Sequence, residues 1–205
     1  MSNRLHTDTE ELLRRARAGD APALGQLLEN YRRYLALLAR LQIDRWLQSK
    51  VDAADLVQET FLEAHRDFPQ FQGATEAEWV NWLRQLLARN LADVVRRYRG
   101  SQRRDVRLER QLAAELDQSS RVLDGALVAK QSSPSQHAAR QEQAVLLAEM
   151  LDRLPEAYRE VLILHQLQDL SFPEVARQMG RSVDSVKNLW LRALARLGRL
   201  LGDVG

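Results

Sequence analysis

Cysteine is absent from this chain of 205 residues, and glycine and proline are scarce, with nine and five residues. The absence of cysteine excludes a disulfide framework, a zinc site built from thiolates and a cysteine nucleophile, and it fits a reducing compartment. Few glycines and prolines favour helices over a turn-rich β architecture. The N-terminal residues lack the apolar segment of a signal peptide, and no uncharged apolar run of about 18 residues occurs. We therefore expect a cytoplasmic protein without membrane insertion.

Charge of one sign is not in excess, since the formal net charge is only +2, but the two signs are separated along the chain. Residues 52–78 have a net charge of −6, and residues 84–110 have a net charge of +6. Adjacent segments of opposite sign predict two different partners. The cations are mostly arginine, which suits bidentate phosphate contacts, although a GC-rich coding sequence would also favour arginine.

Helix start and stop signals organise the first half of the chain. Thr9 is expected to cap a first helix that ends at Gly19, and Pro22 suits the first turn of a second helix that runs to about Leu41. A third helix is expected to begin at Asp52. Together with the long helix that follows them, these helices give residues 5–100 enough amphipathic helix to fold alone.

A fourth, long helix is predicted between the capping box Thr75-x-x-Glu78 and Gly100. Its apolar positions recur with the helical period, and most of its arginines lie on the other side. Basic groups beside aromatic rings are typical of nucleic-acid binding, in which each stacked base contributes roughly 1–3 kcal/mol. Trp82 lies within the apolar stripe and is interpreted as a core residue, whereas Trp79 is left open between core and surface.

Residues 101–139 show a weaker pattern, and the run Ser132-Ser133-Pro134-Ser135-Gln136 is typical of a tether. Part of 103–117 is nevertheless expected to be helical. The resulting fold class is all-α, with two small helical domains joined by a flexible linker. The expected boundaries are 1–100 for the first domain, 101–139 for the linker and 140–205 for the second domain.

The end of the chain has the pattern of a helix-turn-helix, in which Gly180-Arg181-Ser182 separates two amphipathic helices. The first begins at the capping box Ser171-x-x-Glu174, and the second follows Ser182. The apolar residues of the second helix share one face that should pack inward. Its opposite face offers polar and cationic side chains that suit the phosphates and base edges of a DNA major groove. Two helices of an ordinary bundle are the alternative interpretation.

Four carboxylates of the third helix fall within about 80° around the helix axis. Like charges in a row destabilise a helix unless a cationic surface faces them, and a solvated face is the alternative. A carboxylate metal site would also need Glu-x-x-His pairs, and none of the four histidines is preceded by glutamate at that spacing. We therefore expect no metal site. The four carboxylates are Asp52, Asp55, Glu59 and Glu63.

Catalytic motifs are missing from the sequence. It contains no glycine-rich phosphate loop, no G-x-S-x-G, no H-E-x-x-H, and no histidine with a serine or aspartate partner at a recognisable spacing. We therefore expect no enzymatic activity, no catalytic residue and no cofactor.

Three groups of motifs follow one another along most of the chain. The first is Asp55-Leu56-Val57-Gln58-Glu59-Thr60-Phe61; the second combines Trp82-Leu83, Ala88-Arg89-Asn90 and Arg96-Arg97; the third combines Leu154-Pro155-Glu156, Leu170-Ser171 and Ser185-Val186-Lys187. They resemble the polymerase-binding segment, the promoter-melting helix and the −35-reading domain of bacterial RNA polymerase sigma factors. Within the sigma-70 family, the chain resembles the small, two-domain extracytoplasmic-function (ECF) group.

This resemblance implies a transcription initiation factor that directs core RNA polymerase to promoters by reading −10 and −35 elements and aiding strand opening. The implied partners are the clamp helices of the β′ subunit, the β flap, promoter DNA and, as in signal-responsive members, an anti-sigma factor. The protein would be associated with the nucleoid when bound to polymerase. Where the family usually has Ser-Arg-Leu after the Val-Lys pair, this chain has Asn188-Leu189-Trp190.

The resemblance and the residue patterns together assign three sets of contacts. The polymerase contacts are Asp52, Asp55, Gln58, Glu59 and Glu63. The −10 contacts are Phe71, Gln72, Trp79, Asn81, Arg84, Arg89, Asn90, Arg96 and Arg97. The −35 contacts are Arg181, Ser182, Asp184, Ser185, Lys187, Asn188, Arg192 and Arg196.

Two other functions compete with this interpretation. The main alternative is a stand-alone helix-turn-helix regulator whose upstream domain senses a ligand or dimerises, but it leaves the adjacent acidic and basic segments unexplained. A third hypothesis is a helical adaptor or anti-sigma-like binding protein, in which the basic segment would contact protein instead of DNA.

Overall fold

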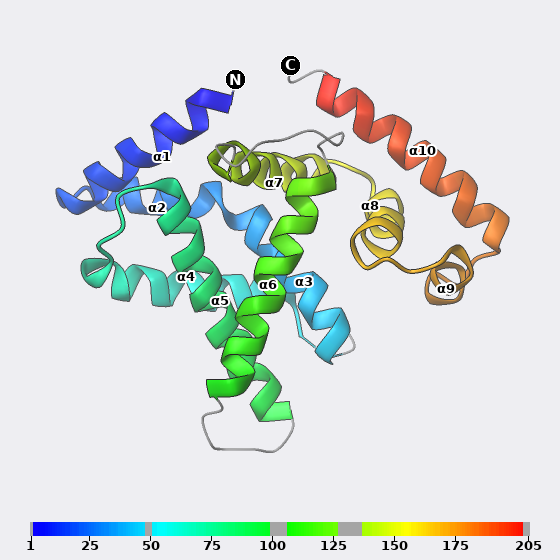
Figure 1. Ribbon diagram of the computed structural model, residues 1–205, viewed down its shortest axis with the longest axis horizontal. Coiled ribbons are helices and arrows are strands. Elements are labelled where there is room, and N and C mark those ends of the chain that lie inside the picture. The colour runs from blue at the N-terminus through cyan, green and yellow to red at the C-terminus, as the bar shows by residue number, and fades with distance from the viewer. Residues whose placement is uncertain (1, 48–50, 99–105, 127–136, 203–205) are drawn as a thin grey trace.

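Every regular element in the part of the chain that the structure describes is a helix (Figure 1). The structure is a computed structural model that describes residues 2–47, 51–98, 106–126 and 137–202, and its side chains are described for 9–43, 51–98, 106–123 and 144–201. The helices are α1 (Ser2–Arg17), α2 (Ala21–Asn30), α3 (Arg32–Leu47), α4 (Ala53–Asp67), α5 (Glu76–Tyr98), α6 (Val106–Ala126), α7 (His137–Asp152), α8 (Glu156–Leu162), α9 (Phe172–Gln178) and α10 (Val183–Gly202). A short 3₁₀ helix, η1 (Phe68–Gln70), follows α4, and a π-helical turn, η3 (Ile163–Leu167), follows α8.

The predicted helix starts are confirmed where a side chain caps the backbone. Asp52 accepts a hydrogen bond from the amide of Ala54 at 2.8 Å and begins α4. At the start of α5, the Glu78 carboxylate accepts from the Thr75 amide at 3.0 Å, and the Glu78 amide donates to the Thr75 hydroxyl at 3.3 Å. Ser171 and Glu174 form the same box at α9. These caps satisfy amide groups that have no partner within the helix.

Hydrogen bonds from the amides of Thr75 and Ala74 lower the pKa of the Glu78 carboxyl. A carboxyl with a lowered pKa in the folded chain stabilises the fold above its ordinary pKa, and this contribution is lost as the pH falls through the lowered value. The contribution of the Glu78 cap to the start of α5 is therefore lost in acid.

Two expectations for the first helices are wrong. Thr9 does not cap α1 but lies inside it, because its hydroxyl is buried at 3.0 Å from the Tyr31 hydroxyl. The expected long second helix is two helices that meet at Tyr31, whose amide bonds back to Leu28. The Tyr31 hydroxyl also donates to the buried Glu76 at 2.6 Å, so a tertiary network fixes this break.

The segment expected as a linker contains the long helix α6, which extends beyond the predicted 103–117. Its residues Leu112, Leu116 and Leu123 have no exposed surface, and α6 packs against α3, α5 and α7. Figure 1 shows α6 and α7 lying between α1, α2, α4 and α5 on one side and α8–α10 on the other. The described part of this segment is thus a structural element of the core.

The predicted helix-turn-helix is confirmed by α9 and α10. Gly180 lies between them with φ of +62°, a conformation that glycine adopts without strain. The predicted inner face of α10 packs inward, with Val186 and Ala193 buried and Trp190 against Phe172. No helix within the described ranges is long and apolar enough to span a membrane.

Candidate functional site

The carboxylates of α4 form an exposed row on the side opposite its buried residues. Leu56 and Val57 face the core, and Phe61 is also buried. The exposed residues of this row, named here the acidic surface, are Asp52, Asp55, Gln58 and Glu59.

Glu63 differs from the other carboxylates because it contacts α5. Its side chain is only 14% exposed, and it lies 3.4 Å from the Arg89 guanidinium. The Asn90 amide donates to Glu63 at 3.0 Å and to the Thr60 hydroxyl at 3.3 Å. Asn90 is thus held by two side chains of α4. The Thr60 hydroxyl is itself fixed, because it donates to the Leu56 carbonyl. Glu63 therefore positions α5 in the free chain.

Four aromatic rings gather where η1 meets the start of α5. Phe71 stacks on Trp82 at a centroid distance of 4.8 Å and meets Trp79 edge-on at 5.4 Å. Phe68 lies 6.0 Å from Trp79. Such edge and offset arrangements are favoured by the charge distribution of the rings. The loop that joins η1 to α5 is thereby attached to α5 through Phe71.

The assignment of Trp79 to the DNA contacts is corrected by its burial. Its side chain has no exposed surface, so it offers no face to a base, whereas Trp82 and Phe71 are half-buried. Helical period could not decide whether Trp79 is a core or a surface residue, because Trp79 lies at the start of the helix. The residue that covers it there is Phe68 of η1. Gln72 and Asn81 are exposed beside this cluster.

The basic side of α5 is partly covered by α6, so two of the predicted DNA contacts, Arg84 and Arg96, are mostly buried in the free chain. Arg84 is 14% exposed, pairs with Asp117 at 3.0 Å and donates to the hydroxyl groups of Tyr34 and Ser120 at 3.2 and 3.1 Å. Arg96 is 16% exposed and pairs with Asp93 and with Glu109, the latter at 3.4 Å. Both guanidinium groups are engaged in ion pairs and their side chains are mostly buried, because Asp117 and Glu109 of α6 face this side of α5. Arg97 is exposed, and Arg89 is half-buried.

The outer face of the helix-turn-helix is exposed as the sequence predicts. Ser182 caps α10 by accepting from the Ser185 amide at 3.3 Å, and Ser185 is half-buried. Leu189, which stands where the family pattern has arginine, and Trp190, which stands where it has leucine, lie on the half-buried side of α10. The exposed residues are Arg181, Ser182, Asp184, Lys187, Asn188, Arg192 and Arg196.

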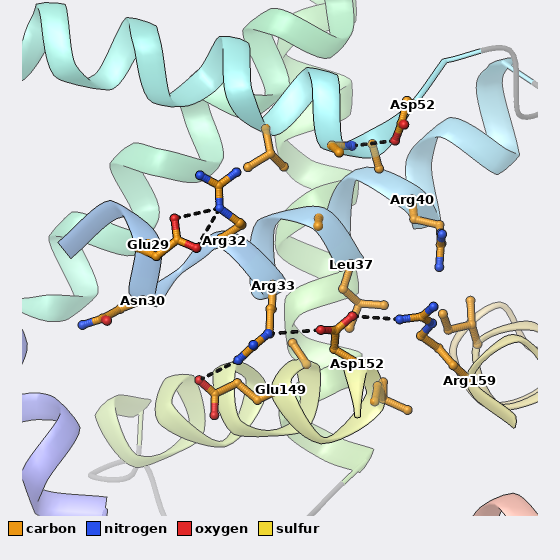
Figure 2. A pocket seen from close by; sticks show the side chains of 17 residues that line it. Glu29, Asn30, Arg32, Arg33, Leu37, Arg40, Asp52, Glu149, Asp152 and Arg159 are labelled. Atoms are coloured by element: carbon orange, nitrogen blue, oxygen red, sulfur yellow. Dashed lines mark hydrogen bonds and ion pairs between the residues drawn. The ribbon is translucent and has the colours of Figure 1, made fainter. Parts of the chain in front are cut away.

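A cavity that sequence reasoning missed lies between α3 and α4 on one side and α7 and α8 on the other (Figure 2). Arg33 of α3 pairs with Asp152 at 3.1 Å and lies 3.9 Å from Glu149, and Arg159 also pairs with Asp152 at 2.8 Å. The pairs of Arg33 join the first half of the chain to the second, and the pair of Arg159 joins α8 to α7. Asp52, at one end of the acidic surface, lines the same cavity. No local motif pointed to the cavity, because its walls come from segments far apart in the sequence.

No group of three histidine, aspartate or glutamate side chains with the geometry of a metal site occurs among the described residues. The described residues do form an exposed row of acidic and polar side chains on α4 and an exposed polar and cationic face on α10.

Comparison with protein families gives two matches in chain order. Residues 28–101 match the family model of sigma-70 region 2, and residues 144–197 match that of sigma-70 region 4. The two matches contain the acidic surface and the aromatic cluster in the first, and the helix-turn-helix in the second.

Curated relatives align over nearly the whole chain. The ECF RNA polymerase sigma factor SigM of Mycobacterium tuberculosis is 30% identical over 192 residues, which are 94% of this chain and 84% of SigM. The RNA polymerase sigma factor NccH of Alcaligenes xylosoxydans xylosoxydans is 29% identical and covers 94% of both chains. The ECF RNA polymerase sigma-E factor of Escherichia coli K12 is 27% identical, with coverage of 89% and 88%.

Among solved structures, CnrH in complex with the cytosolic domain of CnrY is 25% identical, covers 97% of this chain and 99% of that chain, and gives a TM-score of 0.35. BldN in its complex with RsbN is 26% identical, with coverage of 92% and 98% and a TM-score of 0.31. The ordered matches to both sigma regions and the identity to SigM over most of both chains show that this protein belongs to the ECF group of the sigma-70 family, and that it is a non-enzymatic sigma factor for transcription initiation with RNA polymerase.

Proposed function

We propose that the acidic surface of α4 is the main contact with core RNA polymerase, and that it binds the clamp helices of the β′ subunit. The supporting observation is that Asp55, Gln58 and Glu59 are exposed in one row, while the apolar side of the same helix is buried. A row of like charges is stabilised by a cationic partner. The β flap would bind the second domain, and the complex would act in the cytoplasm at the nucleoid.

The domain division that goes with this proposal is 1–100, 101–139 and 140–205, with α6 packed on the first domain. The two family matches lie on either side of α6, which supports this division. An anti-sigma factor stays a prediction from the family resemblance.

The proposed −10 surface consists of the loop at Phe71 and Gln72 and the exposed side of α5. A base flipped from the duplex would stack against an aromatic ring, and such stacking offsets part of the free energy of strand separation, at roughly 1–3 kcal/mol per base. Asn90 is half-buried, and its contacts with Thr60 and Glu63 support a role in positioning α5 where the flipped base would be received. Arg97 and Arg89 would bind the backbone phosphates.

The outer face of α10 is the proposed reader of the −35 element. Its capped N-terminus favours a phosphate, and its exposed polar residues fit contacts to base edges in a major groove. Lys187, Asn188 and Arg192 are the proposed central contacts, because they lie exposed opposite the buried Val186 and Ala193.

Replacing Asp55 and Glu59 together by alanine should weaken binding to core polymerase about tenfold or more, because two charges facing a cationic partner are lost. The measurement is co-elution of the purified chain with sigma-free core polymerase at moderate salt, followed by a titration. The matched control is the double substitution of the exposed Glu10 and Glu11 on α1, which removes the same charge. If both double variants bind equally well, the acidic surface is not the docking surface.

Arg192→Ala should reduce discrimination for the −35 element by about 1–3 kcal/mol, the contribution of a good base contact. Transcription by the reconstituted holoenzyme is compared on promoters with and without that element. Arg199→Ala, on the exposed last turn of the same helix, is the control. Equal loss of transcription on both promoters would assign Arg192 to phosphate contact instead of base reading.

A further inference from the structure

The loop between η1 and α5 is tied at its centre to α1. Arg17, the last residue of α1, donates from Nη2 to the carbonyl oxygen of Gly73. Its Cζ also lies over the Phe71 ring, 5.7 Å from the ring centroid. A guanidinium in this position is attracted by the negative face of the aromatic ring. One exposed side chain thus contacts both the backbone of the loop and its aromatic residue.

Gly73 allows the loop to pass close to this ring. A Cβ atom added at Gly73 would lie 2.5 Å from Cζ of Phe71 and 2.7 Å from Cβ of Glu78. Any side chain at this position would therefore displace the ring or the loop. The carbonyl that Arg17 binds and the ring that Arg17 covers belong to one closely packed unit.

The same unit is fixed to α5 by its other contacts. Phe71 stacks on Trp82, and the amides of Ala74 and Thr75 donate to the Glu78 carboxylate at 2.8 and 3.0 Å. These contacts hold the two ends of the loop, whereas the Gly73 carbonyl between them is bound by Arg17. Without Arg17, the middle of the loop would lose its charge-assisted hydrogen bond.

We propose that Arg17 is a positioning residue for recognition of the −10 element. It holds the Gly73 carbonyl and the Phe71 ring in the geometry that receives an unpaired base, so that α1 contributes to promoter specificity. This inference rests on the proposed function of the loop as the −10 reader. Arg17 lies outside residues 28–101, so the contribution comes from a part of the chain beyond the match to region 2.

Arg17→Ala should lower discrimination at the −10 element about tenfold, since a hydrogen bond to a charged group and a cation–π contact are both lost. Polymerase binding and −35 recognition should not change, because the contacts of the exposed Arg17 are with Phe71 and Gly73 of the loop. If Arg17 only attracted phosphates, its replacement would weaken open-complex formation on matched and mismatched promoters equally. The ratio between them therefore separates positioning from general affinity.

The experiment uses the holoenzyme assembled from core polymerase and the full chain. Wild-type holoenzyme first selects promoter fragments from a random DNA pool, and single substitutions are then made through the melted segment of one selected fragment. Open-complex formation is measured on the parent fragment and on each substituted fragment. Arg14→Ala is the matched control, because Arg14 lies one turn earlier on α1 and pairs with Glu11.

Two further variants test the geometry itself. Arg17→Lys keeps the charge but lacks the planar guanidinium group, so its −10 discrimination should be about as low as that of Arg17→Ala. Gly73→Ala should reduce −10 discrimination as Arg17→Ala does. The double variant should lose no more discrimination than the more damaging single variant, because both substitutions disturb the same packed unit.

The outcomes separate this inference from the proposed function. If the wild-type holoenzyme selects no recurring melted element, the proposal that the loop reads a −10 element fails. If the element recurs and Arg17→Ala discriminates as well as Arg14→Ala, the positioning role is overturned while the −10 proposal stands. Full recovery by Arg17→Lys would also overturn it, because charge alone would then suffice. The positioning role would be established if Arg17→Ala and Gly73→Ala each lowered about tenfold the ratio of open-complex formation on the matched promoter to that on mismatched promoters, with polymerase binding unchanged.

Discussion

Trp79→Ala is expected to lower the free energy of unfolding by about 3–5 kcal/mol, as measured for truncation of large buried aromatic residues. Trp79 has no exposed surface and is packed between Phe68, Phe71 and Trp82. Its removal leaves a cavity in the wall that supports the loop. Urea unfolding followed by circular dichroism measures the change.

The neighbouring exposed residue provides the control for this prediction. Asn81→Ala lies on the same helix but outside the core, so its effect should stay within about 0.5 kcal/mol. If Trp79→Ala left stability unchanged while reducing DNA affinity, the original assignment of Trp79 to the DNA surface would be right and its burial would be wrong.

The helix boundaries could be predicted from the sequence wherever local chemistry determines them. The capping boxes at Thr75 and Ser171 and the cap at Asp52 act within three residues, and each begins a helix as expected. Thr9 has the same type of side chain, but its hydroxyl pairs with Tyr31 in the core instead of with the backbone. A local pattern cannot distinguish these two uses of a hydroxyl group, because the partner comes from another helix.

Most of the acidic surface and of the outer face of α10 could also be predicted, because helical period separates exposed from buried residues. Glu63 is the exception: it shares the face of Asp55 and Glu59, but α5 covers it. The basic segment could not be interpreted in the same way. Charge counting treated Arg84 and Arg97 as equal, yet Asp117 of α6 pairs with Arg84 while Arg97 stays exposed. The position of α6 in the fold decides which arginines are exposed to DNA. Neither net charge nor helical period predicts that position.

Leu116→Ala is expected to lower the free energy of unfolding by about 2–5 kcal/mol, the range measured for leucine truncation in protein cores. Leu116 has no exposed surface, and its helix packs on α3, α5 and α7. A tether would tolerate this substitution, since its side chains make no core contacts. The result therefore decides whether the described part of 101–139 is a linker or an integral part of the core.

The control and a second measurement keep this prediction independent of overall folding. Val122→Ala removes an apolar side chain that is 39% exposed on the same helix, so it should have a much smaller effect. Limited digestion with trypsin provides the second readout, because Arg107, Arg110 and Arg121 lie within α6 and a packed helix resists cleavage. Leu116→Ala should increase cleavage at these sites before the rest of the chain is cut. Rapid cleavage of the wild-type chain within α6 would instead show that this helix is detached. Arg84, which pairs with Asp117 of α6, would then be exposed and could contact DNA.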